Sequence, residues 1–384
     1  MPRLAPHIAD MPGSGVRRIL EAALRRPGTI ILAVGEPGEA VAERIRAAGA
    51  QAWTDGETRY TPNGGIRPLR EAIVAKLARE NGLEVDVDQV WVTVGGTQAL
   101  HQAMSLVLRA GDEVLVPDPG YTTFTMNAHM LQARPVPYRL TPERGFAPDV
   151  AALGDLVTPA TRAIIVNSPS NPLGVTYAPA LIAELVDFAR RHDLWLISDE
   201  VYERFTWGAP HASAASFDTD GRVLSVFSTS KTYAMTGVRV GWLVTPPGLE
   251  QTLLRVQEAA ISCVNSAAQH AALEALAGPQ DGVAAAGAHY AANLESATRV
   301  LDAGGFRYLA PSGAFYLWID MSHVTAGDVT SWCEAFLDDQ GVAVAPGSAF
   351  GASGEGWIRV CVASDRAELV EGLRRLPVPQ APPP

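Results

Sequence analysis

The chain lacks most of the features that mark secreted, membrane-bound or metal-binding proteins. It has three cysteines in 384 residues, far apart and without a CxxC pair, which argues against a disulfide framework or a structural zinc site. It contains no run of about 18 apolar residues, so we expect no membrane-spanning helix. The opening MPRLAPHIADMPGSG has no apolar centre of the kind found in secretory signals. We therefore expect a cytoplasmic protein with no metal site and no membrane contact.

Positive charge is also scarce. The formal net charge of −11 argues against a general nucleic-acid binder. Apolar residues make up 47% of the chain and charged residues 18%, so the chain can bury a large core and is not disordered. At roughly 150 residues per domain, its length suggests two or three domains.

Lysine is nearly absent, because 28 of the 30 basic residues are arginine and two are lysine. A genomic bias toward arginine explains the total. Arginine stays protonated, however, whereas a lysine amine can lose its proton and act as a nucleophile. Lys76 lies at the edge of a helical apolar stripe with Glu80 one turn on, so we interpret it as a solvated surface charge. Lys231 is then the candidate nucleophilic amine.

Short apolar runs predict buried strands, and helical patterns separate many of them. These runs are 90–94, 113–116, 163–166, 194–197, 223–227 and 241–244. The alternation of strand and helix predicts an α/β fold with a mainly parallel sheet covered on both faces. From about Tyr290 onward the pattern changes, and GAFYLWID and EGWIRVCVA predict strands of a smaller α+β domain. The final PVPQAPPP is expected to be disordered.

Small, polar and ionisable residues follow one predicted strand after another. The segments are GGTQAL, PDPGY, NSPSNPLG, SDEVY and STSK. In open α/β sheets, ligands bind at the carboxyl ends of the strands. These segments therefore predict a ligand site along one edge of the sheet.

The segment around Lys231 carries groups that suit a phosphate. Ser228, Ser230 and Arg239 combine two hydroxyls with a forked guanidinium near one amine. GGTQAL adds Gly96, where the backbone can come close to an anion, and the hydroxyl of Thr97 at the start of a helix. A GGT turn alone is weak evidence, but a reactive lysine beside two phosphate-binding segments indicates pyridoxal 5′-phosphate (PLP), joined to the lysine as a Schiff base.

The ring of this cofactor would need further partners. A carboxylate at the pyridine nitrogen keeps the ring protonated, and Asp199 is the candidate, with a helix N-cap as an equal alternative. We interpret the neighbouring Glu200 as solvent-facing. Tyr202 and Asn171 could bind the phenolic oxygen; the alternatives are a half-buried aromatic and an Asn-Pro turn. Tyr121 could stack on the ring or pack against a helix.

With these motifs in place, the chain resembles a known family, the fold type I PLP-dependent aminotransferases of class I/II, and within them the aspartate-aminotransferase-like subgroup. The resemblance runs from about Pro12 to Ala363. It rests on MPGSGVRRILEAA, LAVGEPG, YTPNGGIRPLREAI, SPSNPLG, SDEVYE, STSKTYAMTGVRVG and IRVCVA, which follow in the family's order. The most specific match runs from STSK to Arg239, because Lys231 and Arg239 stand eight residues apart as the family requires.

The resemblance implies a role for each matching residue. Lys231 would join the cofactor and move the substrate α-proton, Asp199 would pair with the pyridine nitrogen, and Tyr202 would complete the catalytic set. The implied cofactor-binding residues are Gly96, Thr97, Tyr121, Asn171, Asp199, Tyr202, Ser228, Ser230, Lys231 and Arg239.

Two further roles follow from the resemblance. Tyr60 of RYTP would reach the cofactor phosphate of the other subunit, so the active sites of a homodimer would be shared. Arg359 would hold the substrate α-carboxylate, helped by Asn171 and the backbone of Gly35. Without the resemblance, Arg359 would be interpreted as a surface charge on a strand.

The resemblance also implies the architecture. We expect a PLP-binding large domain over 36–285 with a mainly parallel seven-stranded sheet. A smaller α+β domain would follow over 286–376, joined by residues 1–35, with a disordered proline-rich tail over 377–384.

One departure from the family bears on the substrate. Aspartate-specific members resemble VGGKQAL, whereas this chain has Thr97 in place of that lysine, and EPGEAV follows where an EPDF-like stretch is usual. We therefore predict transfer of an amino group between a neutral or aromatic L-amino acid and a 2-oxo acid. The alternatives are a PLP-dependent lyase, cyclase or oxidase on the same scaffold. A PLP-binding DNA regulator is a third, but about a dozen residues precede MPGSG, too few for a DNA-binding domain.

Overall fold

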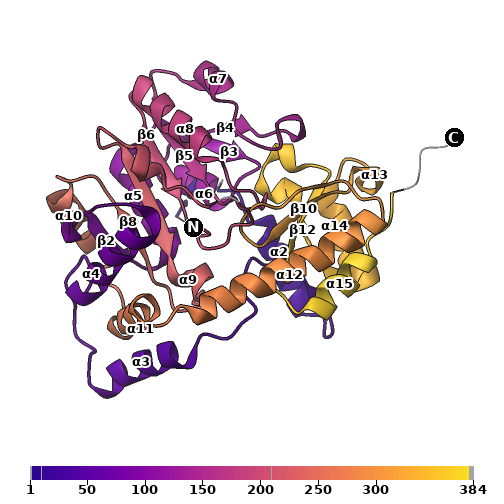
Figure 1. Cartoon of the computed structure of the whole chain (residues 1–384). Helices are drawn as coiled ribbons and strands as arrows, with labels where there is room; N and C mark the ends of the chain where they lie inside the picture. The colour runs from indigo at the N-terminus through magenta and orange to yellow at the C-terminus, as the bar shows by residue number, and fades with distance from the viewer. Residues whose placement is uncertain (1, 10, 209, 380–384) are drawn as a thin grey trace.

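The largest element of the computed structural model, which describes residues 2–9, 11–208 and 210–379, is a seven-stranded sheet (Figure 1). The strands are β2 (Val90–Thr93), β3 (Glu113–Asp118), β4 (Arg134–Arg139), β5 (Thr161–Asn167), β6 (Trp195–Asp199), β7 (Val223–Ser228) and β8 (Gly241–Val244). Their order across the sheet is β2-β8-β7-β6-β5-β3-β4. β8 runs antiparallel to both its neighbours, and the other pairs are parallel. The predicted α/β fold with a mainly parallel sheet is confirmed.

The central strands are buried along their whole length because both faces of the sheet are covered. Alternate residues of one strand enter two different hydrophobic clusters: Ile164 and Val166 face one way, and Ala163 and Ile165 face the other. The covering helices are α5 (Gly95–Val107), α6 (Thr123–Met130) and α10 (Glu250–Ala260) on one face and α8 (Pro179–Arg191) on the other. The apolar runs therefore correspond to strands covered by helices on both sides.

β4 is the strand that the apolar runs did not indicate. Its sequence, RPVPYR, contains two prolines and two arginines, and most of it is exposed or half-exposed. β4 lies at the edge of the sheet, where proline is tolerated because the strand needs partners on one side only.

A smaller domain is built on a second, four-stranded antiparallel sheet. Its strands, in order, are β12 (Ala345–Pro346), β13 (Trp357–Cys361), β10 (Tyr316–Asp320) and β9 (Tyr308–Leu309). The helices of this part are α13 (Ser322–Thr325), α14 (Val329–Gln340) and α15 (Arg366–Arg374). GAFYLWID and EGWIRVCVA supply its two longest strands, as predicted.

The N-terminal segment packs against this smaller domain. β1 (Ile30–Ile31) pairs in parallel with β11 (Val342–Ala343), more than 300 residues later in the sequence. The pairing continues through Leu32, whose N–H donates to the Ala343 carbonyl at 2.9 Å and whose carbonyl accepts from the Cys361 N–H at 2.8 Å. These bonds fix the path of the next residues, 33–36, toward the larger sheet.

The long helix α12 (Asp281–Ala303) spans the predicted domain boundary at 285/286 and runs toward the smaller domain (Figure 1). The remaining helices are α1 (Pro6–Ala9), α2 (Gly15–Leu24), α3 (Glu43–Thr54), α4 (Arg67–Lys76), α7 (Val150–Leu153), α9 (Thr229–Thr232) and α11 (Ser266–Ala277). Among the described residues, no helix combines the length and apolarity needed to cross a bilayer. Most of the tail expected to be disordered, 380–384, lies outside the described residues.

Two predictions about charged residues are wrong. Lys76 is not a solvated surface charge: it is 3% exposed, its ammonium pairs with Glu203, and it donates to Asn81 Oδ1 at 2.8 Å. Glu200 is not solvent-facing but fully buried, with its Oε2 2.8 Å from His211 Nε2. In both cases partners from other segments of the chain satisfy the buried charge, so burial is tolerated.

Candidate active site

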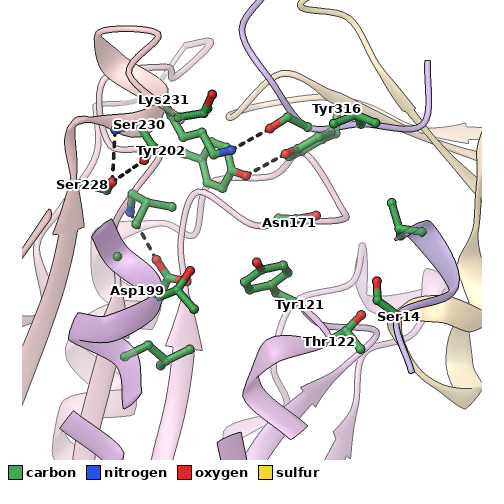
Figure 2. A pocket seen from close by; sticks show the side chains of 18 of the residues that line it. Ser14, Tyr121, Thr122, Asn171, Asp199, Tyr202, Ser228, Ser230, Lys231 and Tyr316 are labelled. Atoms are coloured by element: carbon green, nitrogen blue, oxygen red, sulfur yellow. Dashed lines mark hydrogen bonds between the residues drawn. The ribbon is translucent and has the colours of Figure 1, made fainter. Parts of the chain in front are cut away.

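One cavity of about 390 Å³ lies at the carboxyl ends of the parallel strands, between the two sheets and beside helix α2 (Figure 2). It is lined by every predicted site residue except Tyr60. These are Gly35, Gly96, Thr97, Tyr121, Asn171, Asp199, Tyr202, Ser228, Ser230, Lys231, Arg239 and Arg359. The expectation that the polar segments after successive strands meet at one edge of the sheet is therefore confirmed.

Lys231 lies on α9, a single helical turn that begins directly after β7. Ser228 caps this turn, with its Oγ accepting from the Ser230 N–H at 3.1 Å. The Lys231 ammonium donates to the Gly35 carbonyl at 2.6 Å. Burial disfavours the charged form and lowers the pKa of Lys231 to about 8. A pKa near 8 leaves about a tenth of this amine neutral and nucleophilic at pH 7, far more than an ordinary lysine offers.

The hydroxyl and guanidinium groups predicted to hold a phosphate gather around the start of α5. Arg239 donates to the Thr236 carbonyl at 2.6 Å and packs directly on Gly95, where a Cβ would lie 2.3 Å from its Nη2. Gly95 also has a φ of +73°, a backbone conformation that favours glycine. Gly96 and Ser230 line the cavity close by. The two glycines therefore let the guanidinium and the helix start approach the same point.

Asp199 ends β6 and faces the cavity. Its Oδ1 accepts from the Val201 N–H at 3.4 Å within the turn that follows β6. Among the described residues, no helix begins at this point, so the helix N-cap considered as an alternative is wrong. The side chain is buried, and burial raises the pKa of Asp199 to about 7. A positively charged ring nitrogen placed against it would favour the ionised carboxylate.

Arg359 lies on β13 and is 3% exposed, so it is not a surface charge. Its guanidinium donates to Asn171 Oδ1 at 2.7 Å and to the Ala33 carbonyl at 2.5 Å. It lies over the ring of Phe350, 4.7 Å from the centroid. Among the described residues, its Nε has no hydrogen-bond partner. A buried guanidinium with a free donor is a ready receptor for a carboxylate.

Two backbone carbonyls of the segment after β1 accept from the cations of the pocket. The Ala33 carbonyl accepts from Arg359, and the Gly35 carbonyl accepts from Lys231. The predicted role of the Gly35 backbone toward a substrate carboxylate stays a prediction. Tyr121 lines the cavity and packs edge-on against Phe124 of α6, with ring centroids 5.7 Å apart, so its packing against a helix is confirmed. Its stacking on a cofactor ring stays a prediction.

Sequence reasoning missed Tyr316, at the start of β10. Its hydroxyl oxygen lies 2.6 Å from that of Tyr202 (Figure 2). Its ring lies under Arg359, with its centroid 4.5 Å from Cζ. In GAFYLWID this tyrosine looks like an ordinary aromatic of a buried strand. Several residues of α2, including Val16, Arg17 and Leu20, also line the cavity.

Tyr60 is the predicted residue that the structure does not bring to the cavity. It is 90% exposed and borders a different surface hollow, with Trp53 and Cys263. Within one chain it therefore takes no part in the pocket.

Known proteins are similar to this chain over most of its length. Residues 27–376 match the family described as "Aminotransferase class I and II". The aspartate aminotransferase of Pyrococcus horikoshii is 32% identical over 377 residues, covering 97% of this chain and 96% of that protein. The aromatic-amino-acid aminotransferase 2 of Thermococcus litoralis is 33% identical, with 94% of each chain covered.

Solved structures agree with the sequence comparison. The Thermus thermophilus aspartate aminotransferase with maleate superposes with a TM-score of 0.92 at 34% identity, covering 98% of this chain and 99% of that one. The chain therefore belongs to the class I and II aminotransferase family and is a transaminase.

Proposed function

We propose that this transaminase uses PLP to move an amino group between a neutral or aromatic L-amino acid and a 2-oxo acid. The observation that carries the proposal is one pocket that holds a buried lysine of lowered pKa, a buried carboxylate and a buried arginine with a free donor. When bound, PLP supplies an aldehyde for the lysine and a ring that withdraws electrons from the substrate α-carbon.

The residues of the pocket fit this cofactor. Ser228, Ser230 and Arg239 would hold its phosphate together with the start of α5, where Gly95 lets the guanidinium pack close to the backbone and Gly96 lines the cavity. Asp199 would hold the ring nitrogen and Tyr202 the phenolic oxygen. Tyr121 would stack on the ring, and Thr97 and Asn171 would complete the cofactor contacts.

Residues of the same pocket would bind the substrate and move its α-proton. Arg359 would bind the α-carboxylate and Asn171 would keep the guanidinium oriented. Lys231, released from the Gly35 carbonyl, would take the α-proton and return it at the cofactor carbon. A direct test incubates the PLP-loaded enzyme with one amino acid. Formation of one equivalent of 2-oxo acid and of pyridoxamine phosphate supports transfer, whereas ammonia without them contradicts it.

The walls of the cavity support a neutral donor. Apolar side chains of α2 and of neighbouring elements line it, namely Val16, Leu20, Leu100 and Phe350. Arg17 also lines it, but its side chain is 71% exposed and faces Glu21 at 3.4 Å, which offsets its charge. Thr97 stands where aspartate-specific relatives are expected to have lysine. The relatives include enzymes named for aspartate and for aromatic amino acids, so both classes belong in the test.

We expect neutral aliphatic or aromatic donors to exceed aspartate in kcat/KM. Arg359 would bind the α-carboxylate of every donor, so it does not discriminate between donors. The second carboxylate of aspartate would be buried with at most one neutral hydrogen bond, from Thr97. Thr97→Lys should raise the aspartate-to-neutral ratio of kcat/KM roughly 10- to 100-fold, the value of one charge-assisted hydrogen bond. A panel of donors against one 2-oxo acid measures this ratio.

Thr97→Met is the matched control, because methionine is similar to lysine in length but carries no charge. It should leave the preference for neutral donors in place. A wild-type enzyme that prefers aspartate or glutamate over every neutral donor would contradict our interpretation of Thr97.

We further propose a homodimer with shared active sites, because Tyr60 is exposed and lies outside the pocket of its own chain. Its hydroxyl would donate to the cofactor phosphate of the partner subunit. Tyr60→Phe should then weaken PLP binding roughly 10- to 100-fold, the loss of one hydrogen bond to a charged group. Equilibrium dialysis of PLP measures the change, and Tyr308→Phe, which removes another partly exposed hydroxyl, is the control.

A heterodimer of one Tyr60→Phe subunit and one Lys231→Ala subunit tests the sharing. If Tyr60 acts across the interface, the site that keeps Lys231 also receives an intact Tyr60, and it binds PLP with wild-type affinity. If Tyr60 acts within its own chain, that site has the lesion and binds weakly. Weak binding at the lysine-bearing site would therefore disprove sharing.

A further inference from the structure

The pair formed by Tyr202 and Tyr316 connects the two parts of the molecule inside the pocket. Tyr202 lies in the turn after β6 of the large sheet, and Tyr316 begins β10 of the smaller sheet. Their hydroxyl oxygens are 2.6 Å apart, and both side chains are at most 3% exposed. Among the described residues, each hydroxyl has the other as its hydrogen-bond partner.

Both hydroxyls keep their protons at neutral pH, because burial raises the pKa of each tyrosine. Two hydroxyls that share one hydrogen bond use one proton between them, so the accepting tyrosine keeps its own proton free for a third group. Tyr202 faces the site of the cofactor, since its ring centroid lies 5.9 Å from Lys231 Nζ. Tyr202 is therefore placed to accept from Tyr316 and to donate onward.

The surroundings of Tyr316 hold its hydroxyl in this position. Gly35 packs directly against it, and a Cβ on Gly35 would lie 1.9 Å from the hydroxyl oxygen. The ring lies under the guanidinium of Arg359 and edge-on to Tyr202, with ring centroids 5.6 Å apart. Both the hydroxyl and the ring are thus confined by neighbours.

We propose that Tyr316 is a positioning residue, whose hydroxyl donates to Tyr202 and so strengthens and orients the hydrogen bond from Tyr202 to the phenolic oxygen of the cofactor. The inference rests on the proposed binding of PLP to Lys231. Consecutive hydrogen bonds polarise one another, so the acceptor of one becomes a better donor in the next. Tyr316 thereby acts on the cofactor without touching it.

This relay has a measurable consequence for the nitrogen of Lys231. Once joined to the cofactor, the Lys231 nitrogen would carry a proton at low pH and lose it as the pH rises. The negatively charged phenolic oxygen of the cofactor would then no longer have a positive charge beside it. A donor to that oxygen stabilises the deprotonated state and lowers the pKa of the nitrogen. Weakening the donor should therefore raise the pH at which the visible absorbance of the PLP-loaded enzyme changes.

The experiment titrates this absorbance in four proteins: wild type, Tyr316→Phe, Tyr202→Phe and the double variant. Phenylalanine keeps the ring under Arg359 and removes the hydroxyl alone. We expect Tyr316→Phe to raise the midpoint by about half a pH unit and Tyr202→Phe by about 1 to 2 units. In the Tyr202→Phe background, Tyr316→Phe should add no further shift, because Tyr316 acts through Tyr202.

Tyr138→Phe is the matched control. Tyr138 is also a buried tyrosine, but its hydroxyl donates to the Ile165 carbonyl at 2.8 Å, outside the cavity. Loss of the Tyr138 hydroxyl should lower the thermal unfolding midpoint and leave the midpoint of the absorbance–pH titration unchanged. The KM for the amino acid should also stay near the wild-type value in Tyr316→Phe, because the contacts of Arg359 remain.

Two results would overturn the inference while leaving the proposed function intact: a wild-type midpoint in Tyr316→Phe, or an equal shift in both backgrounds. Absence of any visible band when PLP is added to the wild-type enzyme would overturn the proposed function as well. The titration therefore distinguishes the two failures.

Discussion

Replacing Lys231 by alanine should lower kcat by about four orders of magnitude or more, because the variant loses both the covalent attachment of the cofactor and the group that moves the α-proton. Reversible PLP binding should survive, since Ser228, Ser230 and Arg239 remain. Lys231 is one of two lysines in the chain, and the other, Lys76, is held by Glu203. The described residues therefore offer no nearby substitute amine in the pocket.

The measurement combines turnover with the visible spectrum of PLP added to the variant. Lys231→Arg is the matched control, because arginine keeps the positive charge but stays protonated. We expect it to be as inactive as the alanine variant, which would show that the neutral amine is required. Substantial turnover by Lys231→Ala, in buffers free of amines, would disprove the assignment.

Asp199→Asn should leave the fold intact and lower kcat by about 10²- to 10³-fold, the usual cost of one preorganised electrostatic group. An amide cannot hold the ring nitrogen protonated, so the ring would withdraw electrons less strongly. The asparagine amide oxygen can accept the same hydrogen bond, so the turn contact with the Val201 N–H is kept. The substitution thus separates the role of Asp199 in this turn from its role toward the cofactor.

Exchange of the substrate α-hydrogen for deuterium measures this step directly. Asp199→Glu retains a carboxylate and should be less impaired than Asp199→Asn. Near-normal exchange in Asp199→Asn would show that Asp199 serves only to hold the turn after β6.

The strands of the large sheet could be predicted because their burial is local in the sequence. Each apolar run, such as 163–166, corresponds to a strand covered on both faces, and the polar segments after these strands meet in one cavity. The edge strand Arg134–Arg139 could not be predicted from apolarity, because one of its sides needs no partner and tolerates proline and arginine.

Whether a charged or aromatic side chain is buried depends on partners from other segments of the chain. Lys76 pairs with Glu203, 127 residues away, and Glu200 contacts His211, 11 residues away, so both charged side chains can be buried. Tyr316 shares a hydrogen bond with Tyr202, 114 residues earlier in the sequence. Such pairs come together only in the folded chain, and no local pattern around either member indicates them.

The parallel pairing of β1 with β11 has a consequence for synthesis on the ribosome. The Ala33 and Gly35 carbonyls, which accept from Arg359 and Lys231, follow β1, and β1 pairs with Val342–Ala343. During synthesis the large sheet can form before residues 342–343 have been made. Until then β1 and the carbonyls that follow it lack the strand with which β1 pairs. The pocket is thus the last part to be assembled, and cofactor capture should report completion of the whole chain.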